Sequence, residues 1–256
     1  GNNIKATSGA LTGTGRTGAI DEGGLAPNTA YTRTLRAFNG SLDSFSSTAV
    51  TKWTLAAAPT TGAIVCDKPV DVWTNAAQFT FTAVGGFGAG TVAGYRYVWD
   101  QNATYSFSGT ETVWDSGDLP LPVGSEGSWY LHVQALNGEG AASGTLDLGP
   151  YKFDGTGPEN PGTATETGGA QNDTVQSAVS DPAFTWPAGT DALSGIQGYS
   201  VYFGDDSSGT SETFVTSAAY DPAGVSAGGT YYLRVRARDG AGNDADEWAT
   251  IFTFIY

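Results

Sequence analysis

Hard oxygen ligands gather in the second half of the chain. They are Asp154, Asp191, Asp239, Asn243, Asp244 and Asp246. Carboxylate and carboxamide oxygens of this kind are what Ca²⁺ prefers. The segment from Asp239 to Asp246 does not have the spacing of an EF-hand loop. Two interpretations stay open: a structural calcium held by the first five of these residues, or ordinary turn chemistry, in which Asp and Asn cap their own backbone.

Tryptophans form a second candidate site. Trp114 and Trp248 could form an exposed platform on which sugar rings stack, because indole presents a large flat apolar face. The alternative for each is packing in a core or between domains. The sequence therefore predicts possible polysaccharide binding through these two residues.

The sequence offers few residues suited to nucleophilic or acid–base catalysis. His132 is the only histidine, and the alternation of its segment predicts an outward, exposed side chain. Cys66 is the only cysteine, and neither it nor any serine lies in a recognisable nucleophile motif. One His and one Cys cannot make a zinc site. A carboxylate pair of the glycosidase type remains formally open, although most Asp and Glu stand in Gly- and Ser-rich loops. We expect no catalytic residues and no cofactor beyond a possible calcium.

A repeated segment indicates which strands carry these residues. A segment with alternating apolar residues that ends in Asn–Gly or Asp–Gly occurs at 31–40, 129–138 and 231–240. The period of two predicts a strand, and the terminal dipeptide predicts a tight turn. The leading aromatics at 31, 129 and 231 are about 100 residues apart, which is the size of one antiparallel sandwich. In the first copy Arg33 interrupts the apolar alternation.

At these segments the chain resembles known families. Leu25-Ala-Pro-Asn-Thr-Ala-Tyr31, followed by Ala37-Phe-Asn-Gly40, resembles the end of a fibronectin type III domain. Residues 127–133, 148–154, 191–199 and 238–243 resemble immunoglobulin-like repeats of large bacterial secreted and surface proteins. The resemblance implies an all-β fold of tandem antiparallel β-sandwiches in a rod-like arrangement, with little or no helix. It also implies that the leading aromatic is the tyrosine-corner residue.

Three domains are expected: residues 1–58 as the C-terminal half of a sandwich, and 59–154 and 155–256 as complete sandwiches. The first segment should supply strands within 10–20, 31–38 and 47–55 and expose an apolar inner face. Either upstream strands or a neighbouring subunit, by strand addition, would cover that face. The last strand, 249–255, is strongly β-forming and would invite pairing with another chain if it lay on an edge.

Composition limits the partners and the location. The 256 residues carry a net charge of −15, which argues against binding nucleic acid through its phosphates. No apolar run of about 18 residues is present, so membrane insertion is not expected. The sequence has no Met and does not begin with a signal peptide, which we interpret as a processed or excised part of a longer exported protein. The expected location is extracellular or at the cell surface.

These observations favour a non-catalytic structural or adhesive module. Its sharpest version is a subunit of a self-assembling surface filament or layer that uses strand complementation, with copies of itself or neighbouring repeats as partners. The alternative is a carbohydrate-binding or spacer module of a secreted polysaccharide-active enzyme. An enzyme in its own right is disfavoured, because the chain has one His and no catalytic motif.

Overall fold

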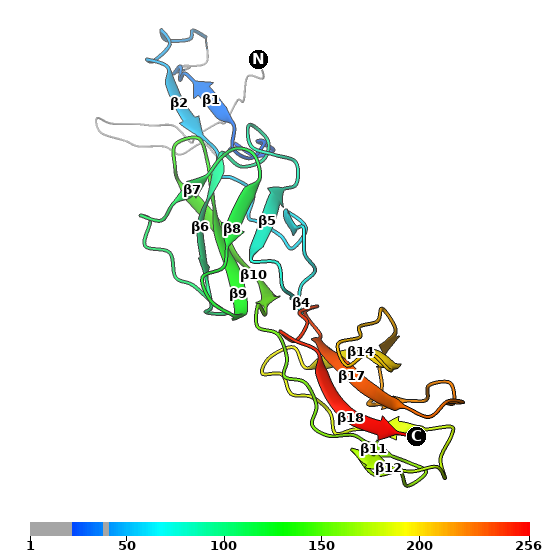
Figure 1. Cartoon of the computed structure of the whole chain (residues 1–256). Helices are drawn as coiled ribbons and strands as arrows, with labels where there is room; N and C mark the ends of the chain where they lie inside the picture. The colour runs from blue at the N-terminus through cyan, green and yellow to red at the C-terminus, as the bar shows by residue number, and fades with distance from the viewer. Residues whose placement is uncertain (1–21, 38–40) are drawn as a thin grey trace.

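The computed structural model describes residues 22–37 and 41–256. Strands are its only regular elements, and they form a short ribbon followed by two β-sandwiches (Figure 1). The parts follow one another along an elongated molecule, so the predicted all-β, rod-like architecture is confirmed. The strand predicted within 10–20 lies outside the described residues. The described part of the chain holds no helix of the length and apolarity that a membrane crossing needs.

The first part is an antiparallel ribbon of β1 (Ala30–Arg33) and β2 (Val50–Trp53). Tyr31 pairs with Lys52 and Arg33 with Val50, and residues directly opposite share a face. That face therefore carries two cationic side chains beside Tyr31 and Val50. The expected apolar inner face is therefore mixed on these strands: Val50 is exposed, but two of the four positions are charged.

The middle sandwich has a three-stranded and a five-stranded sheet. The first is ordered β3 (Ile64–Cys66), β5 (Gln78–Ala83), β8 (Leu119–Pro122). The second is ordered β4 (Trp73–Thr74), β10 (Ala142–Phe153), β9 (Gly127–Leu136), β6 (Gly94–Asp100), β7 (Val113–Trp114). All neighbours are antiparallel except β4 and β10. Phe79 and Phe81 from one sheet meet Leu131, Val133 and Tyr151 from the other in a closed core.

The third part repeats this plan. Its smaller sheet is ordered β11 (Thr165–Glu166), β13 (Phe184–Thr185), β16 (Ala219–Tyr220). Its larger sheet is ordered β12 (Thr174–Val175), β18 (Ala249–Ile255), β17 (Thr230–Asp239), β14 (Ile196–Gly204), β15 (Phe214–Val215). Phe184 packs against Leu233, Val235 and Phe254 in a second, separate core. The predicted domain boundaries at 58/59 and 154/155 stay predictions.

The last strand is not an edge. β18 pairs antiparallel with β17 and parallel with β12, where Thr174 lies beside Phe254 and Val175 beside Ile255. Its backbone groups are therefore engaged on both sides. The condition under which this strand would invite another chain is not met, and β12 and β15 form the edges of the sheet instead.

Candidate metal centre and the domain seams

Three carboxylates from distant segments meet where the middle sandwich joins the third part. Asp154 follows β10, Asp191 stands in the loop before β14, and Asp239 ends β17. One oxygen from each lies within 4.8 Å of the others. Asp154 and Asp239 are fully buried, and Asp191 is half-buried. The cluster therefore draws ligand atoms from both sides of the junction.

Backbone amides hold these carboxylates in place. The Ser194 N–H donates to Asp154 Oδ2 at 3.2 Å, and the Gly195 N–H donates to Asp191 Oδ2 at 2.7 Å. The Asn243 N–H donates to Asp239 Oδ1 at 2.7 Å. Amide donors orient the oxygens without neutralising their charge. None of the three forms an ion pair with a side chain in the described residues.

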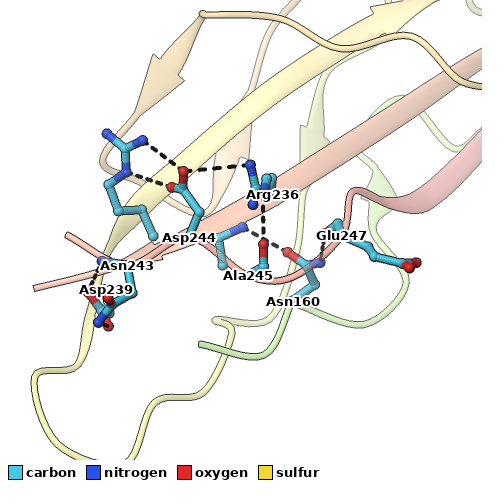
Figure 2. A network of polar contacts seen from close by, with 9 residues as sticks. Asn160, Arg236, Asp239, Asn243, Asp244, Ala245 and Glu247 are labelled. Atoms are coloured by element: carbon cyan, nitrogen blue, oxygen red, sulfur yellow. Dashed lines mark hydrogen bonds and ion pairs between the residues drawn. The ribbon is translucent and has the colours of Figure 1, made fainter. Parts of the chain in front are cut away.

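Asn243 ties the cluster to residues 154–164, which join β10 to β11 and are called the linker below. Its Nδ2 donates to the carbonyl oxygen of Asp154 at 2.9 Å and to Asp239 Oδ2 at 2.8 Å. Figure 2 shows Asn243 lying against Asp239 at the end of the strand. Of the five residues proposed for calcium, Asn243 thus adjoins the three clustered carboxylates.

Asp244 points elsewhere. Its carboxylate accepts hydrogen bonds from Arg238, at 2.7 and 3.1 Å, and lies 3.7 Å from Arg236 Nη1 (Figure 2). The bonded Arg238 guanidinium outweighs burial and holds the pKa of Asp244 below its usual value. Asp244 thus lies outside the cluster of three carboxylates, and its role as a calcium ligand stays a prediction.

Sequence reasoning missed Asn160, which fastens the linker to the third part. Its Oδ1 accepts the Ala237 N–H at 2.8 Å, and its Nδ2 donates to the Glu247 carbonyl at 2.7 Å (Figure 2). The only signal was an Asn between Glu and Pro in a Gly- and Pro-rich segment, which reads as an ordinary turn.

The junction between the ribbon and the middle sandwich is held by side-chain amides, whereas the junction around Asp154 is held by carboxylates. Asn28 is almost fully buried; its Nδ2 donates to the Gly88 carbonyl at 2.7 Å, and its Oδ1 accepts the Gly138 N–H at 2.8 Å. Asn137 Nδ2 donates to the Thr54 carbonyl at 3.0 Å. We call this junction the first seam, and the one around Asp154 the second seam.

Two predicted exposures are wrong. His132 lies on the outer face of its sheet but is fully buried, because the loop 101–112 lays Tyr105 over it. Trp114 is 4% exposed, packs against Phe87 and Tyr95, and donates its indole N–H to the Gly117 carbonyl at 2.9 Å. Trp114 therefore cannot offer a face to a sugar ring. Trp248 is half-buried, and its glycan-stacking role stays a prediction.

Comparison with known proteins finds similarity to part of an exoglucanase. No family model matches it. The chain is 30% identical over 239 residues to exoglucanase B of Cellulomonas fimi, and the alignment covers 90% of the chain and 21% of that protein. The chain thus spans about a fifth of the length of this relative.

Solved structures of modular β proteins are also similar. The fibronectin(III)-like modules of Clostridium thermocellum CbhA match with a TM-score of 0.39 at 14% identity, over 74% of this chain and 93% of theirs. The FN1–FN3 domains of chicken CNTN1 match with a TM-score of 0.36 at 16% identity, over 89% of this chain and 76% of theirs. TM-scores this low carry no weight, so the fold rests on the sheets themselves. Two successive cores, each closed between a three-stranded and a five-stranded sheet, make the described chain a tandem of two β-sandwiches preceded by a short ribbon.

Proposed function

We propose that the chain is a non-catalytic spacer of a secreted, polysaccharide-active enzyme. Its similarity to a stretch of exoglucanase B runs along 90% of the chain and motivates this assignment. In this proposal the partners are neighbouring domains of the same polypeptide, and the setting is extracellular. The spacer would hold a glucan-cleaving domain at a fixed distance from the next domain.

The observation that carries the proposal is the bonding of the linker at the second seam. The Asp154 carbonyl accepts from Asn243, and its carboxylate accepts from the Ser194 N–H. A Cβ at Gly157 would meet the Asp244 carbonyl, so the linker backbone also lies close against the third part. A linker fixed at several points restricts bending, whereas a free Gly-rich linker would behave as a flexible coil.

Small-angle X-ray scattering tests the fixed spacing. Asn243→Ala removes the donor to Asp154 and should broaden the distance distribution and shorten the mean end-to-end length. Ser208→Ala, at an exposed position of the third part, is the matched control. A wild-type chain that already scatters as freely jointed parts would overturn the spacer.

We also propose that Ca²⁺ occupies the cluster of Asp154, Asp191 and Asp239. Three negative charges this close repel one another, and two of them are buried. A divalent cation that accepts oxygen ligands would offset that repulsion and bind residues of both sides at once. The ion would make the second seam stiffer, which serves the spacer.

Calorimetric titration of the intact chain with CaCl₂ tests this site. One tight equivalent is expected, weakened by about tenfold or more in Asp191→Asn, because the charge of the ligand set tunes affinity. Asp205→Asn removes an exposed carboxylate from the same part and should leave the titration unchanged. Heat that is equal in both variants would show that Ca²⁺ binds only to the general acidic surface.

Carbohydrate binding is the second candidate, and the half-buried Trp248 motivates it. Sedimentation with insoluble cellulose measures it: retention that is lost in Trp248→Ala would favour a binding module over a passive spacer.

The filament hypothesis required an unpaired last strand that could pair with another chain. β18 is paired on both sides, so it does not offer such a strand. Sedimentation equilibrium of the native chain checks that hypothesis directly.

A further inference from the structure

A second cluster of titratable groups lies on the outer face of the five-stranded sheet of the middle sandwich. His132 on β9 has Val98 on β6 to one side and Asp147 on β10 to the other. The loop 101–112, which joins β6 to β7, lays Tyr105 over the imidazole with 5.7 Å between ring centroids. The His132 side chain is 0% exposed. This loop therefore seals the histidine from water.

Both ring nitrogens face carboxylates. Nδ1 lies 2.6 Å from Asp147 Oδ1, and Nε2 lies 3.3 Å from Asp100 Oδ1. An ionised carboxylate only accepts hydrogen bonds, so each nitrogen must carry a proton to bond its partner. Both carry one only in the imidazolium form. A neutral ring would turn the lone pair of a fully buried nitrogen toward one of these two partly exposed carboxylates, which is costly for the nitrogen.

The surrounding charges favour a cation at this place. Burial acts to raise the pKa of Asp100, but hydrogen bonds from Asn102 and His132 outweigh it and lower that pKa, so this carboxylate stays ionised at neutral pH. Glu111 Oε1 lies 3.4 Å from the Tyr105 hydroxyl, on the loop above.

Two further ionisable groups lie near the ring. Tyr130, on β9, lies with its ring 6.5 Å from the imidazole. Arg96, the cation on the neighbouring part of β6, is turned to Gln134, to which it donates at 3.3 Å. With Asp100, Asp147 and Glu111, this makes three carboxylates around one guanidinium and the imidazole.

We propose that His132 is a charged latch for the loop 101–112. The imidazolium binds the carboxylates of β6 and β10 together and supports Tyr105, and loss of its proton breaks one of the two bonds and frees the loop. The direction follows from the charge: the latch is closed at low pH and opens as the imidazole loses its proton. The device goes beyond the spacer function, since it controls a local opening of the middle sandwich and not the distance between domains.

Nuclear magnetic resonance decides the protonation state, because His132 is the only histidine of the chain and gives a single imidazole signal. With ¹⁵N-labelled histidine at neutral pH, both ring nitrogens should show the protonated signature. Amide protection in the loop 101–112 should fall on raising the pH, with the same midpoint as the ring. A singly protonated ring at neutral pH, or loop protection that ignores the ring titration, would overturn the latch.

A variant pair separates the latch from general destabilisation. His132→Gln should reduce protection in the loop by about tenfold or more, while amides of the core strand β5 keep theirs, because local opening precedes global unfolding. Arg96→Gln removes a charge from the same face without touching either latch bond and should leave loop protection unchanged. Equal losses in loop and core would assign His132 to general stability instead. Should His132→Gln not fold, the wild-type titration alone decides.

Discussion

Cys66 ends β3 with its side chain half-buried against the middle core. Burial is the largest influence on this thiol and raises its pKa to about 11. The neighbouring Asp67 acts in the same direction through its negative charge. Because the thiolate is the nucleophile, the raised pKa makes this cysteine weakly reactive at neutral pH in the folded chain.

We therefore expect iodoacetamide to alkylate Cys66 slowly in the native chain and rapidly in urea, as followed by intact mass. The raised pKa also has a stability consequence with a fixed sign. The fold prefers the neutral thiol, so this contribution is fully present below the ordinary thiol value of 9.0 and is lost as the pH rises through about 11. Equal alkylation rates in the folded and unfolded chain would contradict the prediction.

Gly138 allows Trp53 to pack closely against the turn after β9 at the first seam. A Cβ there would lie 2.7 Å from the Trp53 ring, closer than real side chains approach. Gly138→Ala should displace Trp53 and cost about 1–3 kcal/mol, as overpacking does. Chemical denaturation monitored by tryptophan fluorescence measures this loss. Gly124→Ala is the control, because a Cβ there meets nothing within 4 Å.

Single residues show where sequence reasoning ends. Asp154, Asp191 and Asp239 could be named as oxygen ligands from their types, but their meeting within 4.8 Å depends on two loops and a domain junction. The pairing of Asp244 with Arg238 could not be predicted from the sequence, because it depends on how the turn after β17 is folded. His132 and Trp114 were misplaced because a covering loop and a neighbouring ring, both distant in sequence, bury them.

At the scale of elements, the repeat predicted the long strands well. Residues 129–136 and 231–238 make up most of β9 and β17, because eight alternating residues show a clear period of two. Two-residue strands such as β4, β11 and β12 have no period to read, and they exist only because long neighbours offer partners. The parallel partner of β18 could not be predicted for that reason.

The ribbon β1–β2 differs from its counterparts in the face it presents. Arg33 and Lys52 stand where the third part has Leu233 and Phe254, both fully buried. Arg33 is held by Glu22 at 2.6 Å, and Lys52 lies 3.7 Å from Glu139. A sandwich core closed over this face would have to bury both cations, which is costly unless they stay paired.

The double change Arg33→Leu and Lys52→Phe therefore tests whether these two charges prevent self-association through this face. We expect it to create an apolar patch and to strengthen self-association by about tenfold or more, since each buried side chain of this size contributes about 1.5–3 kcal/mol. Sedimentation velocity of the variant beside the wild-type chain measures the change. A variant that sediments like the wild type would show that the charges do not protect the face.

At the scale of the whole molecule, the two seams follow one plan with different chemistry. In both, an asparagine in the turn after the repeated strand donates a hydrogen bond to a backbone carbonyl at the end of the preceding part. Asn137 donates to the Thr54 carbonyl, and Asn243 donates to the Asp154 carbonyl. The first seam adds the neutral Asn28, whereas the second adds carboxylates. Only the second seam should therefore respond to a metal ion.

Chelation turns this difference into a prediction for the intact chain. If Ca²⁺ occupies the cluster, adding it at about 100 times its dissociation constant should stabilise the parts that hold the site by about 2.7 kcal/mol, and EDTA should reverse the gain. Differential scanning calorimetry should show the shift in the transition to which the third part contributes. The Gly138→Ala variant, which weakens the first seam, should keep the full response, while Asp191→Asn should lose it. A Ca²⁺ response that survives in Asp191→Asn would place the ion elsewhere on the acidic surface and leave the second seam joined by hydrogen bonds alone.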